Sequence, residues 1–257
     1  MNSIRAERQG PLAVFTVESP PLNLWGPTSA RSFNTALDSL DADPPRGLLV
    51  RAEGRVFTGG VDVNVFSGRD RAAGEAMAHE ILGIAGRVAD LPFPTVFAAH
   101  ALCLTWGFEL ALACDLLLAT EFAHFALVER IVGLSPFMGG PQRLALRAGP
   151  ARAKELVMTG ERYSAATLQQ RGVVNRVLPA DGFDAAARAF ALELASGPTR
   201  AHAVTKRLVD VACSVGEPAA SASTPELASQ LFETEDCRNA IASFLRDGPG
   251  RATFTGR

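Results

Sequence analysis

The sequence predicts an α/β protein whose last part is helical. Over the first two thirds of the chain, short apolar segments rich in β-branched residues alternate with segments of helical periodicity, and helical patterns dominate after them. Such alternation is typical of a layered architecture in which helices cover a sheet. The 257 residues, 47% of them hydrophobic, are enough for a sizeable core.

The first half of the chain supplies two strands and two helices. "LAVFTVE" (12–18) predicts a strand that "SPPLN" ends, and residues 27–41 have helical spacing, with Phe33, Leu37 and Leu40 on one face. "GLLVRAEG" (47–54) predicts a buried strand with a glycine stop. Residues 71–91 form an amphipathic helix that ends before Pro92.

The second half continues the alternation and then becomes helical. "PTVFAAHALC" (94–103) predicts a buried strand, and "WGFELALAC" (106–114) a helix that is apolar nearly all round and therefore buried. Two short strands (115–120 and 123–128), two helices closed by glycine (139–149 and 151–160) and a late strand (172–179) follow. From about residue 183 the pattern is helical, except for "GEPAASASTPE" (216–226), which predicts a loop between helices.

Composition and charge exclude several classes of protein. The net charge of −2 shows no basic excess, which argues against nucleic-acid binding. No apolar stretch is long enough to span a membrane, and the N-terminus has no apolar signal segment. We therefore expect a soluble cytoplasmic protein. The cysteines form no CxxC pair, so reduced, buried thiols are expected rather than a metal site: Cys103, Cys114, Cys213 and Cys237.

Glu109 is an unexpected carboxylate in the apolar segment "LCLTWGFELALACD". Burying an ionised group is costly because it loses its hydration. Thr105 is a plausible N-cap for the helix that follows, and the first amides of a helix can stabilise an anion. Glu109 is therefore either a carboxylate that satisfies helix amides or a group that faces a substrate.

Glu129 lies in a second apolar segment, beside Arg130. It is either half of an exposed ion pair or a second carboxyl group of the same site. If the fold brings Glu109 and Glu129 together, burial and mutual repulsion would separate their pKa values. One could then act as a base and the other as an acid.

A glycine-containing turn, "GRVFTGGVD" (54–62), is the third candidate feature. Gly59 and Gly60 allow backbone conformations that a Cβ would resist, and they allow a ligand to approach the chain closely. An ordinary tight turn explains the same residues. No GxGxxG or GxxxxGK[ST] motif is present, so a dinucleotide or P-loop site has no support.

Four segments in order resemble the enoyl-CoA hydratase/isomerase (crotonase) superfamily. They are "GRVFTGGVD", "PTVFAAHALCLTWGFELALACD", "HFALVERIVGLSPFMGGPQRL" and "AKELVMTGERYSAATLQQRGVVNRVLP". The resemblance implies a crotonase-like spiral of repeated ββα units over residues 1–195. It also implies a C-terminal helical region, residues 196–257, that builds a homotrimer or a hexamer made of two trimers.

The resemblance also implies the chemistry. The substrate would be an acyl-CoA thioester, or alternatively an acyl-carrier-protein thioester, with no metal and no cofactor beyond coenzyme A. Glu109 and Glu129 would be the catalytic residues, and the backbone N–H groups of Thr58 and Trp106 would form an oxyanion hole. Five residues would contact the substrate or CoA: Val56, Phe57, Gly60, Asp62 and Phe137.

Because both glutamates are present, the resemblance favours hydration of a 2,3-enoyl-CoA to a 3-hydroxyacyl-CoA. An isomerase or decarboxylase acting on a thioester is the alternative, and a catalytically silent acyl-CoA-binding oligomer is a third possibility. Trp106 and Phe137 are bulky where the family has small residues. They leave open the identity of the acyl group and the choice between hydratase and isomerase or decarboxylase. The sequence is compatible with both fatty-acid breakdown and secondary metabolism.

Overall fold

The computed structural model describes residues 3–257, which build a six-stranded sheet in the order β1-β2-β3-β4-β6-β9. The edge strand β1 runs antiparallel to β2, and the other neighbours are parallel. The strands are β1 (Ile4–Gln9), β2 (Leu12–Val17), β3 (Gly47–Ala52), β4 (Thr95–Ala99), β6 (Leu116–Thr120) and β9 (Arg176–Leu178).

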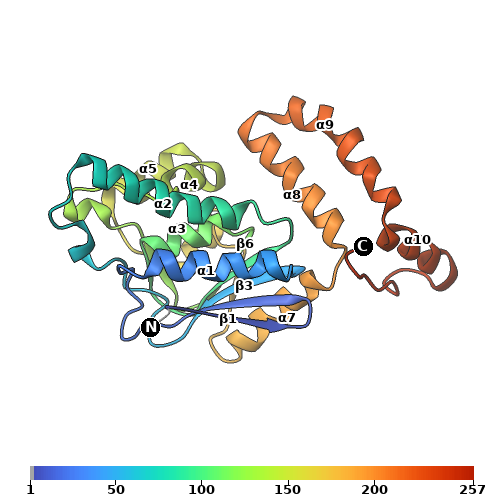
Figure 1. Ribbon diagram of the computed structural model, residues 1–257, viewed down its shortest axis with the longest axis horizontal. Helices are drawn as coiled ribbons and strands as arrows, with labels where there is room; N and C mark the ends of the chain where they lie inside the picture. The colour runs from blue at the N-terminus through green and yellow to red at the C-terminus, as the bar shows by residue number, and fades with distance from the viewer. Residues whose placement is uncertain (1–2) are drawn as a thin grey trace.

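Helices cover both faces of this sheet (Figure 1). Helices α1 (Ser29–Ala42), α2 (Arg71–Ala89) and α3 (Trp106–Ala113) contribute to the larger core, and α7 (Phe183–Ala195) builds the smaller core on the other face. Successive side chains of a strand point to opposite faces. Val14 therefore packs with α7, whereas its neighbour Phe15 packs in the larger core.

A second, smaller sheet consists of three short strands. It joins β5 (Cys103–Leu104), β7 (His124–Ala126) and β8 (Tyr163–Ser164). Around it are the 3₁₀ turns η1 (Val63–Phe66) and η2 (Glu129–Val132) and the helices α4 (Gly140–Ala148), α5 (Pro150–Thr159) and α6 (Ala165–Gln170). This sheet sets β5, which leads into α3, beside β7, which leads into η2.

The C-terminal helices stand to one side of the sheet and its covering helices (Figure 1). They are α8 (Thr199–Ser214), α9 (Glu217–Ser229) and α10 (Glu235–Asp247), with the 3₁₀ turn η3 (Gln230–Glu233) between the last two. Several large apolar side chains on them are exposed: Val209, Val215, Phe232, Ile241, Phe244 and Leu245. Within residues 3–257, no helix is both long enough and apolar enough to cross a bilayer.

Several elements differ from the sequence-based expectation, and the short β8 and α6 were not expected either. Strand β1 was not expected, because it is an edge strand whose charged side chains are mostly exposed, so it carries little apolar signal. The predicted strand 94–103 is interrupted: β4 ends at Ala99, and β5 begins at Cys103 in the other sheet. This break is what turns the chain toward α3.

The segment predicted as a loop, 216–226, is instead largely helical and belongs to α9. Pro218 lies in the first turn of this helix, where a missing N–H costs nothing. Alanine, which has the highest helix propensity, occurs repeatedly along the segment. Pro225 lies inside the helix, so proline here did not mark a loop.

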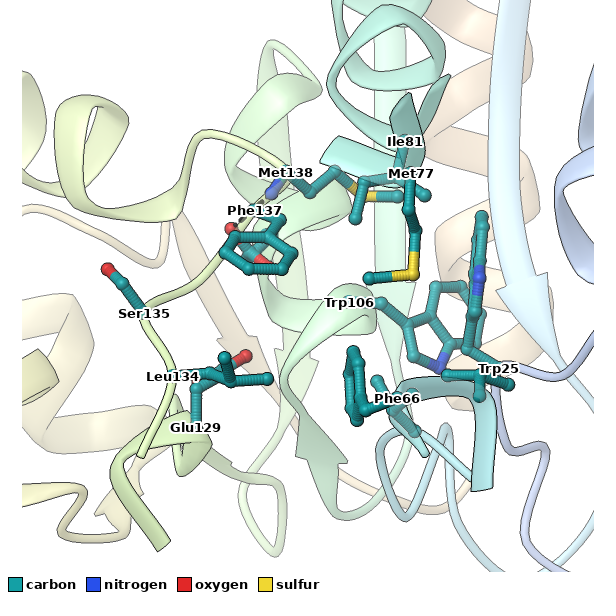
Figure 2. A pocket seen from close by; sticks show the side chains of 13 residues that line it. Trp25, Phe66, Met77, Ile81, Trp106, Glu129, Leu134, Ser135, Phe137 and Met138 are labelled. Atoms are coloured by element: carbon teal, nitrogen blue, oxygen red, sulfur yellow. Dashed lines mark hydrogen bonds between the residues drawn. The ribbon is translucent and has the colours of Figure 1, made fainter. Parts of the chain in front are cut away.

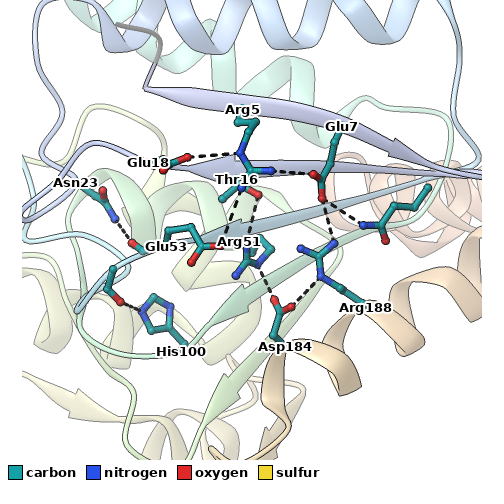
Figure 3. A network of polar contacts seen from close by, with 12 residues as sticks. Arg5, Glu7, Thr16, Glu18, Asn23, Arg51, Glu53, His100, Asp184 and Arg188 are labelled. Atoms are coloured by element: carbon teal, nitrogen blue, oxygen red, sulfur yellow. Dashed lines mark hydrogen bonds and ion pairs between the residues drawn. The ribbon is translucent and has the colours of Figure 1, made fainter.

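A polar network ties α7 to the sheet (Figure 3). Arg51 of β3 pairs with Glu53 at 2.6 Å and with Asp184 at 2.6 Å. Asp184 also pairs with Arg188 at 2.8 Å, and Arg188 reaches Glu7 of β1 at 3.2 Å. Because most of these groups are partly exposed, we assign the network a role in orienting α7 rather than a large contribution to stability.

All four cysteines are free thiols. Cys103 and Cys114 are buried, as expected, and burial raises the pKa of both. Cys213 is exposed and Cys237 is half-buried, so the expectation of buried thiols was wrong for these two.

Candidate active site

Glu109 lies in the first turn of α3 and is only 3% exposed. Its Oε1 accepts hydrogen bonds from the amides of Met138, at 2.9 Å, and Gly140, at 2.8 Å. Between them Gly139 adopts a left-handed φ of 89°, which suits glycine and lets the chain turn into α4. The carboxyl group is thus held by amides that have no partner within α4 itself.

Glu129 begins η2 and is half-buried. Its Oε2 is buried and has no hydrogen-bond partner among residues 3–257. The expected alternative, an exposed ion pair with Arg130, does not occur. Arg130 instead donates through Nη1 to the carbonyl oxygen of Thr159 at 2.7 Å.

Both carboxyl groups line one apolar cavity with about 430 Å³ of space between its atoms, of which about 40 Å³ admits the centre of a water molecule. Figure 2 places Glu129 and Leu134 on one side of it and Trp25 and Trp106 on the other. The cavity is lined by Trp25, Val61, Val65, Phe66, Met77, Ile81, Trp106, Glu109, Glu129, Leu134, Ser135, Phe137 and Met138. Two glutamates twenty positions apart in the sequence therefore meet in one site.

The environment raises the pKa of both glutamates. Burial, reinforced by repulsion from Glu129, raises the pKa of Glu109 to about 8, although the amides of Gly140 and Met138 and the charge of Arg143 oppose the shift. Burial raises the pKa of Glu129 to about 7. Two carboxyl groups that would normally be ionised at neutral pH are thus placed to exchange protons there.

Trp106 is the first residue of α3, so its amide has no partner within the helix. Its indole is 4% exposed and donates through Nε1 to the carbonyl oxygen of Gly60 at 2.9 Å. The ring packs against Trp25 and Phe33, with centroids 5.5 and 5.7 Å away. The large side chain is thus fixed beside the cavity, and no hydrogen bond from the Trp106 amide occurs within residues 3–257.

Thr105 occupies the N-cap position of α3 but does not cap it through its side chain. Its φ of 48° and ψ of −119° are unusual for a β-branched residue and indicate local backbone strain. Its hydroxyl is buried without a hydrogen-bond partner in the described part of the chain. The prediction that Thr105 caps α3 through its side chain is therefore wrong, although α3 does begin directly after Thr105.

The Thr58 amide does not fit the role of oxyanion donor that the resemblance implied. It already donates to the carbonyl oxygen of Leu102 at 3.1 Å, and Thr58 is fully buried and does not line the cavity. Its hydroxyl also has a structural use, since it donates to the carbonyl oxygen of Asn23 at 2.7 Å. An amide held in this way is not free to bind a developing oxyanion.

Val61, three residues further on, has the geometry that Thr58 lacks. It forms a parallel bridge with Trp25, in which the Gly60 carbonyl and the Asp62 amide point toward Trp25. Because backbone groups alternate in direction along an extended chain, the Val61 amide points the other way, and Val61 lines the cavity. No hydrogen bond from this amide occurs within residues 3–257.

The other predicted contact residues divide between cavity and scaffold. Phe137 lines the cavity, as Figure 2 shows, and the Gly60 carbonyl holds the Trp106 indole. Phe57 is fully buried against Phe97, at 4.3 Å between ring centroids, so its side chain belongs to the core. Asp62 accepts from the Asn64 amide at 3.0 Å and caps η1.

Asn23 was not recognised from the sequence, yet it holds the loop that precedes Val61. Its Nδ2 donates to the carbonyl oxygens of Glu53, Val56 and Phe57 at 2.8, 3.2 and 3.0 Å. Val56, a predicted contact residue, thus has its carbonyl engaged by this clamp. The only sequence signal for this role of Asn23 was that a polar residue directly follows "PPL". For the α4 amides, the "GGP" at 139–141 was the corresponding signal.

Within the described residues, no group of three or more His, Cys, Asp or Glu side chains is arranged to hold a metal ion. The site instead combines two carboxyl groups with raised pKa values and two backbone amides that have no hydrogen-bond partner within residues 3–257, beside an apolar cavity. Together with the layered α/β fold, these features are typical of a class of enzymes that use acid–base chemistry.

The chain belongs to the enoyl-CoA hydratase/isomerase family, whose model matches residues 7–253. It is 30% identical over 245 residues to a probable enoyl-CoA hydratase of Mycobacterium bovis, covering 95% of both chains. It is 26% identical to the short-chain-enoyl-CoA hydratase of Clostridium acetobutylicum, again covering 95% of each.

A solved structure supports the same assignment. Enoyl-CoA hydratase subunit I of Geobacillus kaustophilus superposes with a TM-score of 0.92 at 29% identity, over 99% of this chain and 98% of that one. The fold is therefore the crotonase fold, and the protein is an enzyme of the hydratase/isomerase family, as the sequence resemblance implied.

Proposed function

We propose that the protein hydrates a 2,3-enoyl-CoA to a 3-hydroxyacyl-CoA. The observation that carries this proposal is the pair of carboxyl groups, Glu109 and Glu129, that line one cavity with pKa values raised to about 8 and about 7. Hydration needs one group that accepts a proton from water and one that donates a proton to carbon. A pair that holds one proton near neutral pH provides both.

The proposed reaction conserves atoms and charge. The ionised carboxylate takes a proton from water while the water oxygen bonds to C3 of the enoyl group. The electrons of the C2–C3 double bond move toward the thioester oxygen, and the protonated carboxyl group then donates its proton to C2. The carboxyl pair finishes with one proton, and the product has gained one molecule of water.

The thioester oxygen carries negative charge during this step. We place it between the amides of Trp106 and Val61, which both belong to cavity-lining residues. The Trp106 amide also lies at the positive end of the α3 dipole. Fixed donors that meet a developing charge are among the largest contributions to catalysis.

The direct test is to incubate the enzyme with crotonyl-CoA in H₂¹⁸O. We expect loss of the conjugated thioester absorbance together with one ¹⁸O atom in the acyl group of the product. An isomerase or decarboxylase would change the acyl group without incorporating solvent oxygen there. If the protein binds CoA thioesters without any turnover, the proposal fails and a silent binder is favoured.

The raised pKa values predict a bell-shaped pH profile for kcat/KM, with its maximum between about pH 7 and 8. Below this range both groups are protonated and the base is lost, and above it both are ionised and the acid is lost. The rate should fall about tenfold per pH unit on each side. The profile is measured with crotonyl-CoA from pH 5.5 to 9.5; a rate that stays level from pH 5.5 to 7 would contradict the prediction.

We also propose that residues 196–257 form a trimerisation region, so that the enzyme is a homotrimer or a pair of trimers. The family resemblance and the exposed apolar side chains on the C-terminal helices, such as Phe232 and Leu245, support this. Analytical ultracentrifugation distinguishes these assemblies from a monomer.

A further inference from the structure

Trp106 and Trp25 form a shared wall between two cavities. Both residues line the cavity that contains Glu109 and Glu129, and both also line a second void on the other side of their rings. The second void, about 180 Å³ of empty space, has no part wide enough for water. It is bounded by Ser3, Ile4, Val17, Ser19, Asn23, Leu24, Trp25, Ser29, Phe33 and Trp106.

The wall is rigid because its indoles are fixed from several directions. Trp106 is anchored by its hydrogen bond to Gly60 and contacts Trp25, Phe33 and Phe57 through ring packing. Trp25 stacks on Phe33 with centroids 5.6 Å apart and an interplanar angle of 19°. Such a cluster cannot move one ring without disturbing the others, because cores are packed as densely as organic crystals.

The position of Trp106 places this wall beside the reacting atoms. The amide of Trp106 is one of the two free donors at the cavity. A thioester bound to that amide would therefore lie close to the Trp106 indole. The cavity holds about 430 Å³ of space between its atoms, but only about 40 Å³ of it admits the centre of a water molecule, so little of it is wide enough for a chain of methylene groups. A long acyl chain therefore does not fit unless something moves.

We infer that the indole of Trp106 determines acyl-chain length and restricts the enzyme to short-chain thioesters. This inference rests on the proposed function in that it assumes the acyl group enters the cavity with the two glutamates. Removing the indole would join this cavity to the void behind it. The substitution Trp106→Ala keeps the backbone amide, so the donor to the thioester oxygen is retained.

The test compares wild type with Trp106→Ala on 2-enoyl-CoAs of four, six, eight and ten carbons. In wild type we expect kcat/KM to fall at least about tenfold for each pair of added carbons, because one methylene in a closed apolar pocket changes specificity by about 10–200-fold. In Trp106→Ala the optimum should shift to six or more carbons.

Met77→Ala is the matched variant, because Met77 belongs to α2 and lines the first cavity but not the second. We expect its chain-length optimum to stay at four carbons. If Met77→Ala accepts longer acyl chains and Trp106→Ala does not, the acyl chain extends from the cavity toward α2 and the inference is wrong. Trp106→Phe serves if the alanine variant does not fold, and a smaller shift in the same direction is expected.

Binding separates this inference from the proposed function. Calorimetric titration of the wild-type enzyme with butyryl-CoA and octanoyl-CoA, which carry no double bond, needs no turnover. At least about tenfold tighter binding of butyryl-CoA supports the chain-length limit even if no hydration is found. Equal binding of the two, or equal hydration of four- and eight-carbon substrates, overturns the limit and leaves the hydratase proposal intact.

Discussion

Replacing Glu109 by glutamine is expected to lower kcat/KM for hydration of crotonyl-CoA by about 10²–10⁴-fold, the usual contribution of a positioned acid or base. Glutamine has the same shape, and its carbonyl oxygen accepts the amides of Met138 and Gly140 as Oε1 does now. The substitution therefore removes proton transfer and leaves the local structure in place. Glu129→Gln should have a loss of similar size, since each group needs the other.

A stability measurement shows whether the loss of activity in Glu109→Gln comes from unfolding. The pKa of Glu109 is raised from an ordinary value of 4.5 to about 8, so above about pH 4.5 the unfolded chain releases a proton that the folded protein keeps. Wild type therefore loses stability as the pH rises from about 4.5 to about 8. Glutamine does not titrate. The melting temperature of Glu109→Gln should therefore exceed that of wild type by a margin that grows from pH 5 to pH 8.

Glu193→Gln is the control for both measurements. Glu193 is an exposed carboxylate on α7, on the sheet face opposite α3. It should retain wild-type kcat/KM and the wild-type dependence of melting temperature on pH. If Glu109→Gln keeps more than half of the wild-type activity, Glu109 only satisfies helix amides, and the two-carboxyl mechanism is wrong.

The second large effect is expected for Gly107→Ala. A Cβ at this position would lie 2.5 Å from Cγ2 of Thr58, 3.0 Å from Sγ of Cys103 and 3.2 Å from Cδ1 of Phe57. These atoms belong to packed elements that carry the Val61 and Trp106 amides, so relief of the contact displaces the donors. Since loss of one such donor costs about 10²–10³-fold, we expect kcat/KM to fall by at least about tenfold.

Overpacking should also lower the free energy of unfolding of Gly107→Ala by about 1–3 kcal/mol. Gly83→Ala is the matched control, because Gly83 lies within α2 and a Cβ there meets no atom within 4 Å. In that helix alanine is favoured over glycine by roughly 0.5–1 kcal/mol, so a slight gain in stability with unchanged kcat/KM is expected. Chemical denaturation and initial rates measure both variants; equal behaviour of the two would contradict the steric argument.

The sequence predicted the larger elements because their signals are local. Phe33, Leu37 and Leu40 recur at helical spacing and are all buried in α1. The apolar strands 12–18 and 47–54 correspond to β2 and β3. Strand β1 and helix α9 were missed, since an edge strand needs few apolar residues and proline near a helix start resembles a loop signal.

The ordered motifs also identified the family, and with it the two glutamates, from sequence alone. They could not predict which amides are free. Thr58 and Val61 lie three residues apart in the same glycine-containing segment. Only the pairing of that segment with Leu102 and Trp25 engages the Thr58 amide and leaves the Val61 amide without a partner among residues 3–257. Hydrogen bonding between distant segments is a property of the folded chain.

The sequence by itself thus determined the fold class, the family and the presence of two carboxyl groups in apolar surroundings. Only the tertiary structure brought Glu109 and Glu129 into one cavity, raised their pKa values and turned the Trp106 indole into a wall with Trp25. The physical reason is that secondary-structure and motif signals arise from neighbours along the chain. Burial, electrostatic repulsion and cavity shape instead arise from residues that meet only after folding.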